Sequence, residues 1–159
     1  MTLKTLSFAA GAVLLTAALV ACGDEKTDTG ATRSPASPTE VTLLPQPDPE
    51  QPLDDTAVAP KDGVIEIDAT GIKFAPNHLN APADKPVTIR VSNKDTVTHN
   101  LRIAGLDGEY TTDDDAVTDP DDIGGGAGGD LNFTPPVKGS YTFRCDFHPA
   151  GMGGRIVVE

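Results

Sequence analysis

Hydrophobic and polar positions alternate with a period of two along much of the chain from Gly63 onward. This alternation is typical of strands that bury one face of a sheet. Clusters of glycine, proline, asparagine and aspartate separate the apolar runs, and no stretch keeps a helical period over three turns. Strands are therefore predicted in five segments: 64–74, 87–92, 101–103, 140–145 and 156–158. Short strands over this length predict an all-β domain, an antiparallel β-sandwich over residues 63–159.

The first residues have a different pattern. Lys4 precedes an apolar run of 13 residues, Phe8–Val20. A membrane-spanning helix needs about 20 apolar residues, so the run indicates a secretory signal over residues 1–21. The run ends in Leu-Val-Ala-Cys-Gly, which resembles a bacterial lipobox and implies that Cys22 is lipidated and becomes the mature N-terminus. A plain signal with a chance cysteine, or a short uncleaved anchor, is the alternative.

Residues 22–62 are predicted to be the lipidated cysteine followed by a disordered linker. Seven of the fourteen prolines lie between Asp24 and Lys61. Proline cannot continue a helix or a central strand, so this composition indicates an extended tether that holds the domain away from the membrane.

A second interruption, Leu106–Asp130, carries eight acidic residues between Asp107 and Asp122 and then a glycine-rich run. It predicts a mobile surface loop or pair of loops. A solvated acidic insertion is the favoured interpretation, a docking patch for a basic redox partner is the second, and a calcium site is weaker because the acids fit no EF-hand spacing. The net charge of −12 disfavours binding to nucleic acid or to anionic lipid by charge.

The most informative residues lie near the C-terminus, where Cys145, His148 and Met152 form a Cys-x2-His-x3-Met loop. His99 lies 46 residues before the cysteine. Thiolate, imidazole and thioether are the donors that copper prefers. If Cys22 carries lipid, Cys145 is the one cysteine left, and metal ligation is the simplest reason for a free thiol in an exported protein. A Cys22–Cys145 disulfide is the alternative.

These residues carry a resemblance to the cupredoxins, the plastocyanin and amicyanin class of type 1 copper proteins, over residues 63–159. The shared motifs are His-Asn after an alternating strand and Gly-x-Tyr-x-Phe-x-Cys-x2-His-Pro-x2-Met-x-Gly before a terminal strand. The resemblance implies a Greek-key sandwich that binds one copper ion. It also implies that His99, Cys145 and His148 are equatorial ligands and that Met152 is the axial ligand.

Three further residues have expected roles by the same resemblance. Asn100 should tie the two ligand segments together around the cysteine sulfur. Pro149, which has no N–H, should keep the surface beside His148 apolar. Asp146 departs from the Ser or Thr of many relatives. Its carboxylate could still accept a hydrogen bond from Asn100, and its charge is expected to lower the reduction potential. The three-residue spacing before Met152 is a second departure.

The resulting hypothesis is a monomeric, membrane-tethered electron shuttle on the outer face of the bacterial cytoplasmic membrane. Its partners would be redox proteins with a basic surface, such as a cytochrome or an oxidase. A copper carrier that delivers the metal to an oxidase is the alternative, disfavoured by the lack of a Met/His-rich tract. A copper enzyme is not expected, because three histidines cannot supply a second copper centre. Zinc rarely accepts a thioether ligand.

Overall fold

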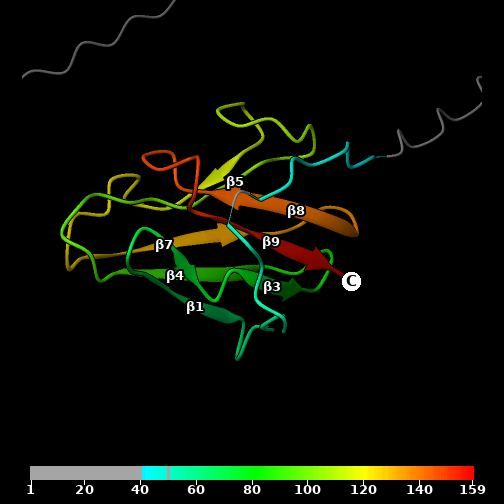
Figure 1. The fold of residues 1–159 in the computed structure, drawn as a ribbon. Helices are drawn as coiled ribbons and strands as arrows, with labels where there is room; N and C mark the ends of the chain where they lie inside the picture. The colour runs from blue at the N-terminus through cyan, green and yellow to red at the C-terminus, as the bar shows by residue number, and fades with distance from the viewer. Residues whose placement is uncertain (1–40, 50) are drawn as a thin grey trace, which may run out of the picture. The chain divides into compact units, whose positions relative to one another are not determined.

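The computed structural model describes residues 41–49 and 51–159, and within them the secondary structure consists of nine strands in two sheets (Figure 1). The strands are β1 (Val64–Ala69), β2 (Phe74–Ala75), β3 (His78–Ala81), β4 (Val87–Asn93), β5 (Arg102–Ile103), β6 (Ala116–Val117), β7 (Gly128–Phe133), β8 (Gly139–Arg144) and β9 (Gly153–Val158). One sheet has the order β2-β1-β4-β7, and the other has the order β3-β9-β8-β5-β6. The predicted all-β sandwich is confirmed.

The core lies between the two sheets and contains the apolar positions of the alternating runs. In β4, Val87, Ile89 and Val91 are buried while the residues between them are more exposed, as the sequence pattern predicts. Phe143 of β8 packs edge-on against Phe74, with 5.5 Å between the ring centroids. Cys145 and Met152 belong to the same buried cluster, so the C-terminal loop is continuous with the core.

Strand pairing is mixed, whereas the sequence analysis predicted an antiparallel sandwich. β1 runs parallel to β4, and β3 runs parallel to β9. The predicted strand over residues 64–74 is a β1–β2 hairpin, because a turn with positive φ at Gly71 and Ile72 separates the two strands. Alternation of apolar residues reports which face is buried and does not report the direction of the neighbouring strand.

The segment Leu106–Asp130, predicted to be loop throughout, contains β6 and the first residues of β7. β7 pairs with β4 from Gly128 to Phe133. Its two glycines hide the strand pattern, since they leave Leu131 as its one fully buried large side chain. A Cβ at Gly129 would approach the end of the Ile123 side chain to 2.9 Å, so glycine lets Ile123 pack closely against this strand.

The folded domain begins before the predicted boundary at residue 63. Gln51 is buried and its side chain exchanges two hydrogen bonds with the backbone of Phe74, at 2.9 and 3.1 Å. Val58 forms a parallel bridge with Leu79 of β3. Leu43 packs against the core as well. The proline-rich composition of this segment predicted a linker. The segment is nevertheless packed against the domain, because the Gln51 side-chain amide and the isolated bridge at Val58 replace a regular strand ladder.

The predicted signal, residues 1–21, and the predicted lipidation site, Cys22, lie outside the described residues. Among the residues that the structure does describe, no helix has the length and apolar character needed to cross a membrane.

Candidate metal centre

The loop between β8 and β9 carries three of the predicted donors and is closed by its own backbone. The N–H of Cys145 donates to the carbonyl of Met152 at 2.9 Å. The N–H of His148 donates to the carbonyl of Cys145, and the N–H of Met152 donates to that of His148, both at 3.2 Å. These three bonds hold the loop as one compact turn, so the positions of its donors are fixed by the strands on either side.

His99 reaches the same point from a distant part of the chain. It follows β4 and pairs with Ile123 through two backbone hydrogen bonds, at 2.9 and 3.1 Å. Its side chain is fully buried. The bridge anchors the histidine to the segment that precedes β7, so this donor is held by a contact between distant parts of the chain.

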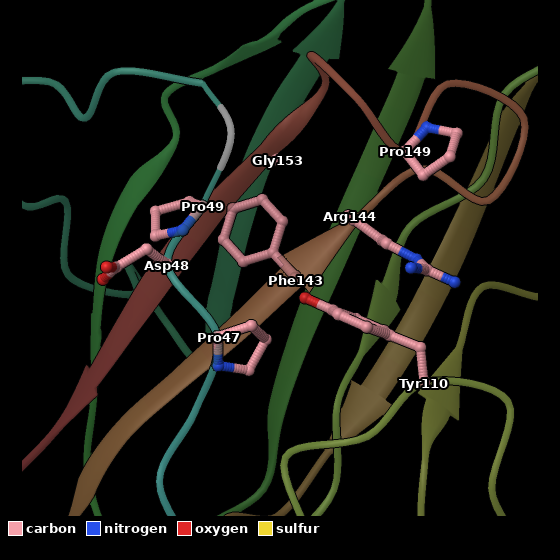
Figure 2. Close-up of a pocket in the computed structure, with 8 residues that line it drawn as sticks. All are labelled: Pro47, Asp48, Pro49, Tyr110, Phe143, Arg144, Pro149 and Gly153. Atoms are coloured by element: carbon pink, nitrogen blue, oxygen red, sulfur yellow. The ribbon is translucent and has the colours of Figure 1, made fainter.

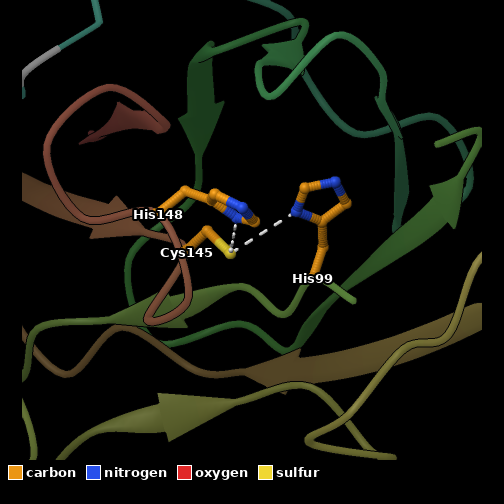
Figure 3. Close-up of side chains that lie close together, drawn as sticks. All are labelled: His99, Cys145 and His148. Atoms are coloured by element: carbon orange, nitrogen blue, oxygen red, sulfur yellow. Dashed lines mark hydrogen bonds between the residues drawn. The ribbon is translucent and has the colours of Figure 1, made fainter. Parts of the chain in front are cut away.

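The side chains of His99, Cys145 and His148 converge on one point (Figure 3). The Sγ of Cys145 lies 3.7 Å from the Nδ1 of His99 and 3.7 Å from the Nδ1 of His148. The two imidazole rings are tilted by 53° with 4.9 Å between their centroids. Both histidines therefore present the same ring nitrogen to one sulfur atom.

This spacing fits a shared metal ion. Thiolate and imidazole ligands lie about 2.3 and 2.0 Å from a metal such as zinc, so one shared ion sets them about 3.7 Å apart. Two imidazoles and a thiolate in a trigonal arrangement, with a weak thioether, are the donor set of blue copper sites. Met152 supplies a thioether on the same loop, where it is fully buried. The donors thus suit copper better than zinc.

Burial raises the pKa of the Cys145 thiol, although backbone N–H groups of Asn100, Phe147 and His148 act in the opposite direction. The thiol is therefore protonated at neutral pH without metal. Because the thiolate is the metal-binding form, loading the site releases this proton.

Asn100 and Asp146 tie the two ligand segments together. The side-chain carbonyl of Asn100 accepts the N–H of Asp146 at 2.8 Å. The amide group of Asn100 donates to the Asp146 carboxylate at 3.0 Å and to Asp121 at 2.7 Å. Asp146 therefore accepts a hydrogen bond from Asn100, as the sequence analysis allowed. This contact joins the residue after His99 to the residue after Cys145.

Asp95 is a functional residue that the sequence reasoning missed. Its carboxylate lies 2.9 Å from the Nε2 of His99 and also accepts the N–H groups of Gly71 and Ile72, at 2.8 and 3.0 Å. The hydrogen bonds from Ile72, Gly71 and His99 lower the pKa of Asp95. A carboxylate in this position holds Nε2 as the protonated nitrogen and leaves Nδ1 free for a metal. Asp95 lies four residues before His99, but the sequence shows it only as a turn residue.

Pro149 lines a small hollow of about 120 Å³ beside the ligand loop (Figure 2). The guanidinium of Arg144 lies over the Tyr110 ring, 4.0 Å from its centroid, on the wall of this hollow. No metal donor of the loop lines it. Pro149 is exposed beside His148, in keeping with the apolar surface expected there.

The remaining histidine and the acidic cluster stand apart from these donors. His78 lies in β3, with Nδ1 3.0 Å from the carbonyl of Asp54. Asp107, Asp114 and Asp115 have carboxylate oxygens within 4.8 Å of one another. Two of them receive loop N–H groups: Asp114 accepts that of Leu106, and Asp115 accepts that of Gly105. These carboxylates shape the loop.

The family model for the cupredoxin-like domain matches residues 51–158, and the chain belongs to this family. The match begins at Gln51, where the buried part of the N-terminal segment starts. None of the curated protein sequences compared with the chain matches it.

Solved structures of auracyanins share the fold. Auracyanin A, described as a "blue" copper protein from Chloroflexus aurantiacus, aligns with a TM-score of 0.52 and 23% identity, over 60% of this chain and 98% of its own. Dithionite-reduced auracyanin from Roseiflexus castenholzii aligns with a TM-score of 0.51 and 22% identity, over 61% and 97%. Auracyanin B aligns with a TM-score of 0.51 and 19% identity, over 67% and 93%.

Family, fold and donor set together define a type 1 site for one copper ion, built from His99, Cys145, His148 and Met152.

Proposed function

We propose that this chain is a carrier of single electrons. The observation that carries the proposal is the convergence of two imidazoles on one buried thiol, each at 3.7 Å. A bound copper ion supplies a one-electron Cu(II)/Cu(I) couple. The chain's part is to hold the donors in one geometry that suits both oxidation states, so that little rearranges when the charge changes.

The hydrogen bonds of the ligand loop and of His99 provide this rigidity. Three backbone bonds close the Cys145–Met152 turn, and two more anchor His99 to Ile123. Asp95 fixes the orientation of the His99 ring through Nε2, the nitrogen that does not face Cys145. A preorganised set of donors costs little reorganisation at the moment of electron transfer.

His148 is the route by which electrons reach a partner. His99 and Cys145 are fully buried, whereas His148 is half-buried at the surface. Next to it, Phe147 has 46% of its surface exposed and Pro149 is exposed. A small apolar surface over the redox centre suits the brief, small contacts of electron-transfer complexes.

The partner would be a redox protein with a basic surface, such as a cytochrome or an oxidase. The chain carries a net charge of −12, and Asp113, Asp114, Asp121 and Asp122 are exposed. Opposite charge on the partner would speed the encounter. We do not propose catalysis, because three histidines allow one copper centre of this kind and the described residues bring together one set of its donors.

Retention of copper in both oxidation states separates this carrier from a copper-delivery protein. We expect a reversible one-electron wave in voltammetry of the copper-loaded full chain. After reduction, a Cu(I)-specific chelator in modest excess should remove no copper over many cycles. Rapid transfer of Cu(I) to the chelator, with copper retained only in the oxidised form, would support delivery of copper instead.

We further propose that the domain is tethered through lipid on Cys22 to the outer face of the cytoplasmic membrane. Support comes from the Leu-Val-Ala-Cys-Gly sequence and the prolines that follow it. The full chain expressed in a bacterium fed labelled palmitate should incorporate the label, and Cys22→Ser should not. Equal labelling of the two chains would refute the tether.

A further inference from the structure

The type 1 site does not explain the surroundings of Arg102, which lies beside the ligand loop. Arg102 lies in β5, three residues after His99, and its side chain is only 15% exposed. It contacts three carboxylates: Asp146 at 2.6 Å, Asp115 at 3.5 Å and Asp121 at 3.8 Å. Burying an arginine is costly unless carboxylates pair with it, so the surroundings of Arg102 are built for its charge.

The first of these carboxylates belongs to the ligand loop. Asp146 follows Cys145 directly, and its N–H and carboxylate bond to Asn100. Its carboxylate accepts hydrogen bonds from Arg102 at 2.6 Å and from Asn100 at 3.0 Å. The carboxylate beside the metal donors is therefore held mainly by the guanidinium of Arg102.

The other two carboxylates belong to the acidic segment, residues 107–122. The side chain of Asp115 is only 1% exposed and accepts the N–H groups of Gly105, Thr111 and Thr112. Asp121 is more exposed and accepts a hydrogen bond from Asn100. Among the residues that the structure describes, Arg102 is the one cation within 4.0 Å of either carboxylate.

We propose that Arg102 is a positioning residue that couples the acidic segment to the copper centre. Its guanidinium is shared between Asp146, beside Cys145, and two aspartates of the segment, Asp115 and Asp121. It has two effects: it offsets the negative charge next to the donors, and it holds the segment against the Asn100–Asp146 contact. The first effect rests on the proposed function, whereas the second is a property of the metal-free chain.

The sign of the first effect follows from charge. A positive group near the donors stabilises the centre when it gains an electron, and a negative group does the opposite. Asp146 alone would lower the reduction potential, and Arg102 counteracts it. Loss of Arg102 therefore removes a positive charge and leaves Asp146 with only the longer contact to Arg144, at 3.4 Å, as an ion pair. Both changes lower the potential.

The test compares Arg102→Gln with Arg90→Gln in the full chain. Arg90 is a matched control, because it pairs with Asp130 and Glu66 on the other sheet and is exposed. Both variants lose one positive charge. At about 0.15 M salt, where screening acts over about 8 Å, Arg102→Gln should lower the reduction potential by more than Arg90→Gln does. Arg102→Lys keeps the charge and should retain most of the wild-type potential.

A second measurement uses hydrogen exchange in the metal-free chain. Arg102→Gln and Arg102→Lys should speed exchange at the amides of Thr111 and Thr112 in the segment and of Asp146 in the ligand loop, while Arg90→Gln should not. Lysine lacks the planar fork that reaches several carboxylates at once, so the lysine variant decides the matter if the glutamine variant does not fold.

Equal potentials for the two glutamine variants, or unchanged exchange at these three amides, would overturn the coupling. The proposed function fails separately: a wild-type chain that takes up copper without a thiolate-to-copper absorption band would refute the electron carrier. The exchange data would still decide the coupling in that case.

Discussion

Replacing Cys145 with serine should abolish the intense visible absorption of the copper-loaded chain. That band requires a thiolate bonded to Cu(II), and Cys145 is the thiol on which both imidazoles converge. Serine keeps the size of the side chain and removes the sulfur. The expected result is complete loss of the blue or green colour. The small hyperfine splitting of a type 1 site should also be lost from the electron paramagnetic resonance spectrum.

The chain supplies a matched control in its second cysteine. Cys22→Ser makes the same substitution outside the described residues and should leave the band at one copper per chain. A third variant, His78→Ala, removes the histidine that lies apart from the donors and should also leave it unchanged. A colourless wild-type chain, or a weak Cu(II) spectrum equal in all variants, would contradict the type 1 assignment.

The sequence predicted the donors because three of the four are nearly contiguous and because their order resembles that of the cupredoxins. Cys145, His148 and Met152 lie within one eight-residue loop, so their spacing alone brings them together. The role of Asn100 was predicted from the resemblance, as the residue directly after the first histidine. Strands with regular alternation, such as β4, were predicted well because burial of one face follows directly from the pattern.

What the sequence did not show depends on contacts between segments. Asp95 is held beside His99 by two further N–H groups from the β1–β2 turn, a contact that the sequence does not show. Arg102 had no visible role, because its three aspartates lie between 13 and 44 residues away. Gln51 looked like part of a linker, and its pairing with Phe74 follows from the tertiary fold.

Replacing Gly154 with alanine should lower the stability of the domain strongly. Gly154 lies in β9, two residues after Met152, and a Cβ there would overlap the backbone carbonyl of Asn77 and the ring of Phe143. Neither can move easily, since Asn77 accepts the N–H of Arg155 and Phe143 is fully buried. Overpacking of this kind costs about 3 kcal/mol.

The matched control is Gly151→Ala, in the same loop, where a Cβ would meet no atom within 4 Å. Thermal unfolding of the metal-free chains should show Gly154→Ala melting about 10 °C below wild type and Gly151→Ala melting near it. Equal melting temperatures for the two variants would contradict the tight packing of β9 against Phe143.

The packing matters for the copper site because Phe143 and Gly154 are paired across β8 and β9, directly beneath the ligand loop. If alanine forces these strands apart, the Cys145–Met152 backbone bond must lengthen, and the absorption band should change along with stability.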